Sequence, residues 1–586
     1  MFRRLKEVEK RGVQQRISSI VFLFIISFLI LFLRLGFLQI VKGRYFRRIS
    51  EENSIQFIPI TNPRGLILDR NGEVLVKNRP CFNISFIQMG IQKDELERTT
   101  ETLSQILNID KVKLEERILE KRNRPFEPVL IAEDVKIEEV AKIGERKSDL
   151  PGVLIQAEPR REYIGREKGA HILGYLGKLS QSEWKELHGE GYRFSDLIGK
   201  QGVEKIYEKY LKGEDGWRQV VVDARGRILR ELSFKEPVPG NNLFLTIDEK
   251  VQEVAEREME GKQGAVVAIC PKTGEVLALV SKPSFDPNIF ICNPKETKEL
   301  QNDPTHPLLN RAIRAGFEPG SSFKVVVAAA ALEEEVISPS IRLSCRGRYY
   351  LGRHGFSCWK KKGHGVLNIE EAIIHSCNVF FYHLGKRLTA EKMAKYAKRF
   401  GLGKETGVDL PGEISGLVPS PKWKKEVRKE KWYAGEDINF AIGQGSLLVT
   451  PLQMANLACL VANRGEVYKP HIVKRIENLS FETIRSFKPE PLISISLSKE
   501  TWDILYIGLK GVVEKGTGRR AFSQHFEVAG KTGTAQNPRG EDHAWFICFA
   551  PALDPKVAVS CLIEHGGKGG AVAAPIAKHV LEAALR

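Results

Sequence analysis

The chain has 586 residues, a length that predicts two to four domains. Its composition, 42% hydrophobic and 28% charged, excludes the disordered, collagen-like and polytopic membrane classes. A formal net charge of +17 would ordinarily point to nucleic acid as the partner. However, residues 1–48 hold eleven basic and two acidic residues, so more than half of the charge lies in this short segment. A basic, nucleic-acid-binding body is therefore excluded.

Residues 17–41 are the first predicted element, a membrane-spanning helix. This stretch has no charged residue except Arg34 and is about long enough to cross a bilayer. No small-residue cleavage site follows it, so we interpret it as an uncleaved signal-anchor rather than a cleaved signal peptide or a buried core helix. Residues 1–16 are then a cytoplasmic tail. The rest of the chain is expected outside the cytoplasm, because no second apolar span follows.

Residues 42–240 predict a mixed α/β domain without a catalytic cluster. Two apolar runs flank Asn71-Gly72, a dipeptide typical of hairpin turns because both residues tolerate positive φ. Residues 90–150 show helical periodicity. The Pro/Gly-rich stretch 236–242 predicts a linker, so we place the domain boundary at residue 240.

Residues 241–586 predict a second domain, with strand-like runs near both of its ends and helices between them. This order indicates one sheet assembled from distant parts of the chain. The predicted strands are 264–269, 274–280, 544–550 and 557–563, and the predicted helices include 324–336 and 574–585.

Ser321 and Lys324 form the first candidate catalytic pair. Their i, i+3 spacing puts them on one face of a helix, about one turn apart. Ser321 would lie at the helix N-terminus, where free N–H groups favour developing negative charge. A serine hydroxyl becomes a good nucleophile only when an adjacent base takes its proton, and a lysine serves as that base only when its pKa is lowered.

Two further motifs strengthen this interpretation. Ser376-Cys377-Asn378 follows the first pair, and Lys531-Thr532-Gly533-Thr534 lies near the last strands. Together they would supply a serine for proton relay, an amide for substrate binding and a second cationic residue. S-x-x-K, S-x-N and K-T-G in this order correspond to the motif set of penicillin-binding proteins and class A β-lactamases.

The whole chain resembles the class B penicillin-binding proteins, which are D,D-transpeptidases of peptidoglycan synthesis. The resemblance extends to the stretches PRGLILDRNG, RREY, GKQGVE, SFDPN, GQG and TPLQ, and thus covers about residues 15–586. SFDPN and the GKQGVE stretch resemble the elongation type, the penicillin-binding protein 2 group, more than the division type.

The resemblance implies a fold of class α/β (α+β): a transpeptidase domain like that of serine β-lactamases, with a central, mainly antiparallel sheet. A mixed α/β pedestal or dimerisation domain and a single transmembrane helix would precede it. The residues that the resemblance places in the site have distinct expected roles. These are nucleophilic attack (Ser321), general base (Lys324), proton relay (Ser376, Lys531), binding of the stem-peptide amide (Asn378) and binding of the terminal carboxylate (Thr532, Gly533, Thr534), with the Ser321 and Thr534 backbone N–H groups as the oxyanion hole.

Cys377 differs from the residue found in class A β-lactamases, which have Asp at the middle of the second motif. In non-helical backbone, Ser376 and Asn378 would face the cleft and Cys377 would face behind it. Cys345, Cys358 and His364 lie upstream. Three thiols and one imidazole would suit a structural zinc, and elongation-type relatives resemble this chain in carrying a metal near the same motif. The alternative is a Cys345–Cys358 disulfide with His364 at the surface. No cofactor is expected for catalysis itself.

The expected function is therefore crosslinking of stem peptides through a serine acyl-enzyme, with release of D-alanine, in elongation and rod-shape maintenance. A D,D-carboxypeptidase side activity is also expected. The alternatives are a division-type relative, a membrane-anchored β-lactamase and a β-lactam sensor. The resemblance implies β-lactam inhibitors, a RodA-type polytopic glycosyltransferase and elongation scaffold proteins as partners. It also implies an inner-membrane location with the catalytic domain on the periplasmic side.

Two other segments have ordinary interpretations. Residues 422–432, KWKKEVRKEKW, could be a basic-aromatic binding patch, but a solvated loop is the favoured interpretation. Lys515-Gly516-Thr517-Gly518 resembles K-T-G in the wrong order and predicts a turn.

Overall fold

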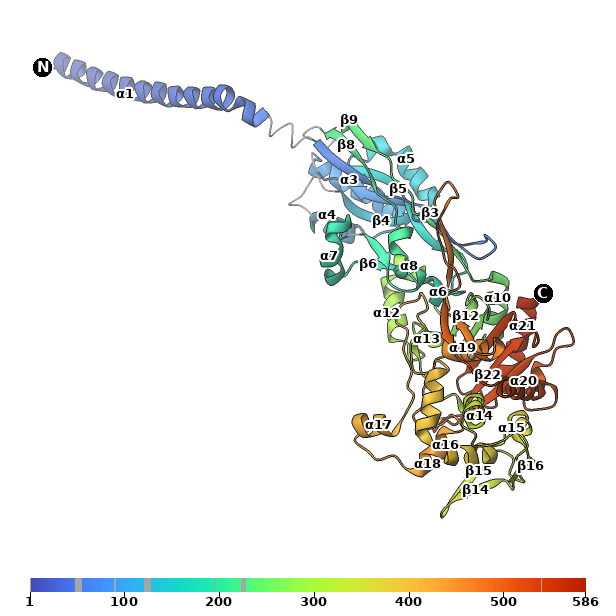
Figure 1. The fold of residues 1–586 in the computed structure, drawn as a ribbon. Helices are drawn as coiled ribbons and strands as arrows, with labels where there is room; N and C mark the ends of the chain where they lie inside the picture. The colour runs from blue at the N-terminus through green and yellow to red at the C-terminus, as the bar shows by residue number, and fades with distance from the viewer. Residues whose placement is uncertain are drawn as a thin grey trace. The chain divides into compact units, whose positions relative to one another are not determined.

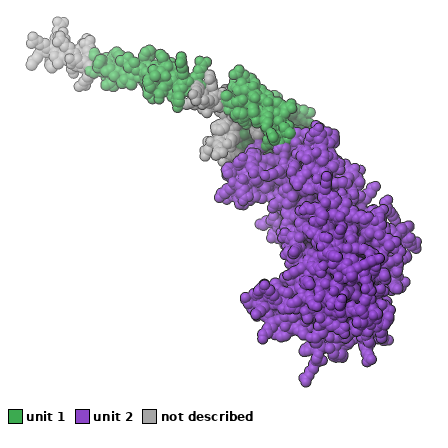
Figure 2. All heavy atoms as spheres, in the orientation of Figure 1, with its two compact units in different colours: residues 1–62, 80–159, 214–238 green, residues 63–79, 160–213, 239–586 purple. Residues whose placement is uncertain are grey.

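The structure is a computed structural model that describes residues 2–47, 55–88, 91–120, 128–194, 196–222, 228–538 and 540–586. Two compact units divide the chain (Figure 2). Unit 1 comprises residues 1–62, 80–159 and 214–238, and unit 2 comprises residues 63–79, 160–213 and 239–586. Two segments of the expected pedestal domain thus pack with the unit that carries the catalytic motifs. The chain enters unit 2 for the last time at Pro239, and the boundary at residue 240 stays a prediction.

The N-terminal helix of unit 1 fits a single-pass membrane anchor. Helix α1 (Phe2–Gly36) continues as the π-helical turn η1 (Phe37–Val41). Residues Ile17–Val41 have a mean hydropathy of 2.8, and none of this span is buried inside the structure. This span of 25 residues, uncharged except for Arg34, is long enough to cross a bilayer, whereas a core helix of this length would be covered by its own protein.

The rest of unit 1 contains two sheet segments with helices against one of them. Strands β1, β8 and β9 form an antiparallel sheet, and β4 pairs with the second half of β3. Apolar side chains of β3, β4 and three helices meet in one core. The helical prediction for 90–150 is therefore interrupted by a strand. The elements are β1 (Ile55–Ile60), β3 (Val74–Phe86), α3 (Lys93–Leu107), α4 (Lys111–Glu120), β4 (Val129–Val135), α5 (Ile137–Glu145), η2 (Lys147–Asp149), β5 (Val153–Tyr163), β8 (Gly216–Val222) and β9 (Ile228–Lys235).

Unit 2 begins with the hairpin expected at Asn71-Gly72. Gly72 has φ +95°, and the backbone N–H groups of Asn71 and Glu73 donate to the Asp69 carboxylate at 2.7 and 2.9 Å. This turn joins β2 to the start of β3, and β2 also pairs in parallel with β10. The short elements of this part are β2 (Ile67–Leu68), α6 (Ala170–Leu173), β6 (Leu176–Lys178), α7 (Gln181–Leu187), η3 (His188–Glu190), β7 (Leu197–Gly199), α8 (Gly202–Ile206), α9 (Glu208–Leu211), β10 (Asn242–Leu245), β18 (Val473–Glu477) and β19 (Thr483–Ser486).

A buried ion cluster joins the separate segments of unit 2. The Glu204 carboxylate is fully buried and lies 2.7 Å from both Arg64 and Arg161. Arg64 also pairs with Glu208 at 2.7 Å, and Arg161 donates to the Gly65 carbonyl at 2.6 Å. Burying four charges is tolerable only when each is paired, so this cluster fixes segments 63–79 and 160–213 against each other.

The catalytic part of unit 2 is built on a five-stranded, fully antiparallel sheet, which confirms the assembly from both ends of the domain. Its order is β12-β11-β23-β22-β21. Successive side chains point to opposite faces of the sheet. Val266 of β11 is buried in the hydrophobic cluster on one face, and Val267 is buried in the cluster on the other face. The strands are therefore apolar throughout. They are β11 (Gly264–Ile269), β12 (Val276–Lys282), β21 (Ala529–Ala535), β22 (His543–Ala550) and β23 (Val557–Ile563).

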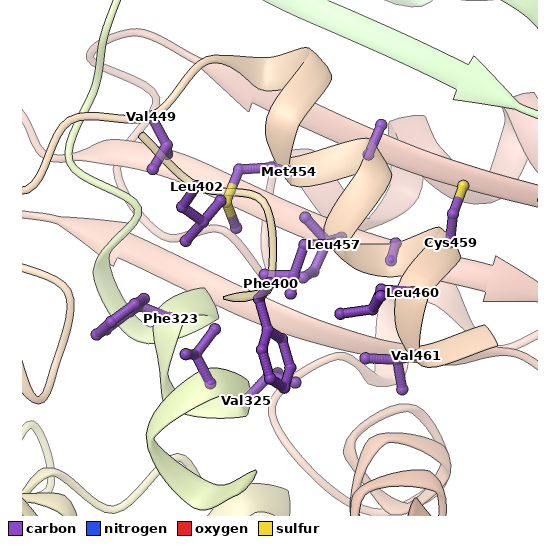
Figure 3. Packing of buried hydrophobic residues seen from close by; sticks show 14 of the residues in the cluster. Phe323, Val325, Phe400, Leu402, Val449, Met454, Leu457, Cys459, Leu460 and Val461 are labelled. Atoms are coloured by element: carbon purple, nitrogen blue, oxygen red, sulfur yellow. The ribbon is translucent and has the colours of Figure 1, made fainter. Parts of the chain in front are cut away.

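Helices cover both faces of this sheet. Helices α10 (Glu249–Glu258) and α21 (Ala573–Leu585) share the cluster of Val266 on one face. Helices α13 (Arg311–Arg314), α14 (Lys324–Glu333) and α19 (Pro451–Ala462) belong to the cluster on the other face. Figure 3 shows this second core, where Phe323 and Val325 lie near Phe400 and the side chains of α19.

The remaining elements of unit 2 surround the motifs or lie at the surface. They are α11 (Ile289–Cys292), α12 (Pro294–Asn302), η4 (Gly320–Phe323), β13 (Leu343–Cys345), β14 (Arg348–Leu351), β15 (His354–Ser357), β16 (Gly365–Leu367), α15 (Ile369–Ile374), α16 (Asn378–Arg399), α17 (Pro421–Trp423), η5 (Lys424–Arg428), α18 (Ala434–Phe440), β17 (Glu466–Tyr468), β20 (Pro491–Ser494), α20 (Lys499–Glu514) and η6 (Arg519–Ala521).

Candidate active site

The first motif lies on a tight turn that leads into a buried helix. Ser321 is in the 3-10 turn η4, directly before α14 begins at Lys324, rather than in the α-helix itself. Gly320 opens the turn with φ +54°, a conformation that favours glycine. Its N–H donates to the Gly443 carbonyl at 2.9 Å. Ser321 is partly exposed, and its hydroxyl has no hydrogen-bond partner among the described residues.

The second motif lies between α15 and α16. Ser376 has a left-handed backbone, with φ +51°, which is unusual for a residue other than glycine and is often found at functional sites. Cys377 is the N-cap of α16, and Asn378 is its first residue. The side chains of Ser376 and Asn378 contact Lys324, whereas the thiol of Cys377 belongs to a separate cluster. The expected division of this motif between two sides is therefore confirmed, although the backbone is not a strand.

Two buried lysines meet at Ser376. The Lys324 amine donates to the Ser376 carbonyl at 2.9 Å and to the Asn378 side-chain oxygen at 2.6 Å, and lies 3.3 Å from the Ser376 hydroxyl. The Lys531 amine lies 2.9 Å from the same hydroxyl. Neither lysine side chain is accessible to solvent. Four of the five predicted catalytic residues are thus joined by hydrogen bonds, and Ser321 lies one turn before Lys324.

Burial changes the acid–base behaviour of both lysines. Desolvation lowers the pKa of Lys324 to about 8, because the low-dielectric interior disfavours the charged amine. Desolvation also lowers the pKa of Lys531, and the nearby charge of Lys324 lowers it further. A lysine with a pKa near neutrality can accept a proton at physiological pH, which is the property required of a general base.

The third motif forms the edge strand β21, which lies against the turn that carries Ser321. A Cβ added to Gly320 would lie 2.5 Å from the Thr534 carbonyl oxygen, and one added to Gly533 would lie 2.8 Å from the Pro319 carbonyl oxygen. The two backbones therefore approach closely only because neither position has a side chain. This brings the Thr532 and Thr534 region of the strand next to Ser321.

Two residues near the site were missed in the sequence. The Thr517 and Thr532 hydroxyls lie 2.6 Å apart. Residues 515–518 form the predicted turn, and through Thr517 they also contact the third motif. The indole N–H of Trp359 donates to the carbonyls of His375 and Ser376, each at 3.1 Å. No pattern in the sequence indicated either contact, because each depends on the tertiary fold.

The four predicted metal-ligating residues come together behind the second motif. One ligand atom from each of Cys345, Cys358, His364 and Cys377 lies within 4.8 Å of the other three. The Nδ1 atom of His364 is 3.6 Å from the Cys345 sulfur and 3.5 Å from the Cys358 sulfur. Ligands at about 2.0 to 2.3 Å from a tetrahedral zinc would lie about 3.5 to 3.8 Å apart, so the donor set and its spacing fit zinc.

The thiols of this cluster are free rather than bonded. Cys345 and Cys358, which could have formed a disulfide, both carry free thiols. The Cys377 thiol, followed by His364, lowers the pKa of Cys358 through hydrogen bonds that favour the thiolate. A thiolate is the form that binds metal.

Comparison with known proteins identifies the family of the chain. The family model of the penicillin binding protein transpeptidase domain matches residues 264–582, which is more than half of the chain. The penicillin-binding protein dimerisation domain matches residues 59–245. The peptidoglycan D,D-transpeptidase MrdA of Acinetobacter baumannii is 37% identical over 99% of this chain and 89% of its own length.

Solved structures agree with this assignment. The penicillin-binding protein PBP2 of Helicobacter pylori, in its complex with MreC, is 28% identical, with a TM-score of 0.79 over 90% of this chain and 98% of that one. A chain of a peptidoglycan synthase complex is 30% identical, with a TM-score of 0.73 over 97% of this chain and 98% of its own. The chain belongs to the class B penicillin-binding proteins of the elongation type, the PBP2 group.

Proposed function

We propose that the chain is a peptidoglycan D,D-transpeptidase that crosslinks stem peptides during cell elongation. One observation carries this proposal. Lys324 and Lys531 both contact the Ser376 hydroxyl, and Ser321 lies one turn before Lys324, on a fold shared with the transpeptidase family. This arrangement provides a partly exposed nucleophile, a buried base of lowered pKa and a buried proton relay in one site. The related A. baumannii protein carries the name of this activity.

In the acylation step, the Ser321 oxygen attacks the carbonyl carbon of the penultimate D-alanine, and its proton passes to the neutral Lys324 amine. The peptide C–N bond then breaks. The leaving nitrogen of the terminal D-alanine takes a proton through Ser376, whose hydroxyl the Lys531 amine contacts. The backbone N–H groups of Ser321 and Thr534 would hold the oxyanion, an interaction that commonly contributes about 3 to 4 kcal/mol.

In the second step, an amine from another stem peptide attacks the ester carbonyl of the acyl-enzyme. The bond from carbon to the Ser321 oxygen breaks, and the proton that the attacking amine loses passes through Lys324 to the Ser321 oxygen. Attack by water instead would give the D,D-carboxypeptidase side activity. Asn378 would hold the donor amide, and Thr532, Gly533 and Thr534 would line the place of the terminal carboxylate. β-Lactams would acylate Ser321 as mimics of the donor.

The cysteine cluster is proposed as a structural zinc site. Its donor set supports this assignment, since three thiols and one imidazole with mutual distances within 4.8 Å suit a tetrahedral ion. The ion would hold Cys345, Cys358 and His364 against Cys377, and so position the second motif. Zinc would take no part in the acyl transfer itself.

The expected location and partners follow from the anchor and from the relatives. The helix at Ile17–Val41 supports a single-pass protein of the inner membrane with its catalytic domain in the periplasm. The H. pylori relative forms a complex with MreC, and another relative belongs to a peptidoglycan synthase complex. These relatives support elongation scaffold proteins and a peptidoglycan synthase complex as partners of this chain, and a RodA-type glycosyltransferase stays an expectation from the resemblance.

Covalent labelling with a fluorescent penicillin tests the proposal. The native chain and a control with the exposed Ser338→Ala should be labelled, whereas Ser321→Ala should not. Labelling that survives Ser321→Ala would overturn the assignment of the nucleophile. Release of D-alanine with formation of a donor–acceptor crosslink, together with slow hydrolysis of penicillin, would identify a transpeptidase. Rapid turnover of penicillin would instead indicate a β-lactamase.

A further inference from the structure

The segment of residues 342–365 is strongly basic. It contains seven arginines and lysines and no aspartate or glutamate. Residues 1–48 carry +9, so these two segments account for 16 of the 17 net positive charges of the chain. The rest of the protein is close to neutral. The seven basic residues are Arg342, Arg346, Arg348, Arg353, Lys360, Lys361 and Lys362.

All seven side chains are exposed, and most have no acidic partner. Arg342 pairs with Glu371 at 2.8 Å, and Arg348 contacts the Ser357 hydroxyl at 3.5 Å. The other five form no ion pair with any residue that the structure describes. A concentration of like charge repels itself and attracts anions, so an anionic partner would be stabilising here.

Two exposed aromatic rings lie within the same segment. Tyr350 is 63% exposed and Trp359 is 56% exposed. The Trp359 ring is fixed, because its N–H donates to the carbonyls of His375 and Ser376. A fixed and exposed indole offers a flat apolar face at little cost in side-chain entropy, which suits stacking on the apolar face of a sugar ring.

The basic segment is attached directly to the active site. Ligand atoms of its Cys345, Cys358 and His364 lie within 4.8 Å of the thiol of Cys377, the middle residue of the second motif. Hairpin β14–β15 extends outward from this attachment (Figure 1). A polymer lying on the segment would therefore pass close to Asn378, where the donor amide is expected.

We infer that residues 342–365 bind an uncrosslinked glycan strand through its sugar rings and the carboxylates of its stem peptides. The sugars would stack on Trp359 and Tyr350, and the carboxylates would pair with the lysines and arginines. The surface would hold the strand beside the cleft while a stem peptide enters it. This inference rests on the proposed transpeptidase function, since it names the polymer that the site would act on. A sugar-stacking ring next to the second motif favours such a strand over an anionic membrane.

Binding of the detergent-solubilised, full-length chain to uncrosslinked strands with pentapeptide stems tests the inference. The variant Lys360→Gln/Lys361→Gln/Lys362→Gln should bind about five- to tenfold more weakly, since each exposed ion pair contributes a small amount. Its binding should also depend less on salt, because fewer ion pairs remain to be screened. Trp359→Leu should weaken binding at unchanged charge.

The control Lys425→Gln/Arg428→Gln/Lys429→Gln removes equal charge from exposed positions near α17 and should bind like the native chain. Penicillin labelling of both triple variants should stay within about twofold of native, which shows that the cleft is intact. Equal loss in the control would indicate a non-specific charge effect and overturn the inference.

Three further results would overturn the inference that residues 342–365 bind a glycan strand. One is native-like binding by the Lys360–Lys362 variant. Another is unchanged binding to strands whose stem peptides have been removed. The third is equally tight, equally lysine-dependent binding to phosphatidylglycerol vesicles, which would assign the surface to lipid headgroups. Failure of the transpeptidase proposal would appear separately, as a native chain that binds strands but is not acylated by penicillin.

Discussion

Lys324 and Lys531 share one hydrogen-bond partner, the Ser376 hydroxyl, at 3.3 and 2.9 Å. Two amines so close together in a buried site cannot both be charged cheaply, so one of them is kept neutral. The hydroxyl between them is the only side-chain group common to both lysines among the described residues. The arrangement therefore connects a neutral base to a second amine through a group that can pass a proton.

The first prediction concerns Ser376. Ser376→Ala should lower the second-order rate of penicillin acylation about 100- to 1,000-fold, because the relay between the two amines is lost. Stopped-flow measurement with a fluorescent penicillin checks this rate. The exposed Ser338→Ala is the matched control. An acylation rate within threefold of native would show that Ser376 relays no proton.

The second prediction is the pH dependence of acylation. Since Lys324 must be neutral to accept the proton of Ser321, and burial lowers its pKa to about 8, the rate should rise with pH and level off above about 8. An ordinary lysine would still be rising at pH 10. The pH profile of the acylation rate checks this. A plateau that begins below pH 6 would exclude Lys324 as the base.

The third prediction concerns the zinc site. Purified, unchelated protein should contain one zinc per chain, and Cys377→Ser should lower both the zinc content and the acylation rate. The partly buried, free Cys270 provides the control Cys270→Ser, which should change neither. Elemental analysis and penicillin labelling measure the two quantities. Native protein without stoichiometric zinc would rule out the metal site.

The fourth prediction concerns the buried ion cluster. Glu204→Gln should lower the free energy of unfolding of unit 2 by about 3 to 5 kcal/mol, because Arg64 and Arg161 would remain buried without a full partner. Glu253→Gln breaks an exposed pair with Lys168 and should change stability by less than about 1 kcal/mol. Urea unfolding followed by tryptophan fluorescence compares the two variants. Equal losses of unfolding free energy in the two variants would mean that burial of the cluster contributes nothing to the stability of unit 2.

The sequence predicted the catalytic sheet and its motifs well, for physical reasons. Strands buried on both faces are apolar throughout, so 264–269 and 557–563 could be recognised without knowing their neighbours. The hairpin at Asn71-Gly72 could be predicted because both residues tolerate positive φ, which is a local property of the sequence. Cys345, Cys358, His364 and Cys377 were grouped as candidate ligands by their chemistry, and they do lie together.

Other features could not be predicted, because they depend on contacts between distant segments. Arg64, Arg161 and Glu204 come from three parts of the chain, and nothing local indicates that they pair. The left-handed backbone of Ser376 is unusual for a residue other than glycine, and nothing in the local sequence predicts it. The contacts of Thr517 and Trp359 with the motifs likewise exist only in the folded unit.

Gly320 and Gly533 lie where the turn of Ser321 and strand β21 approach each other closely. This approach restricts the mutations by which bacteria could become resistant to β-lactams. Any larger residue at Gly320 would overlap the Thr534 carbonyl, and any larger residue at Gly533 would overlap the Pro319 carbonyl. Relief of either overlap would separate Ser321 from strand β21, which is proposed to bind both substrate and drug. A single substitution at either glycine should therefore disturb the site itself, and tolerated changes are expected where side chains already line it.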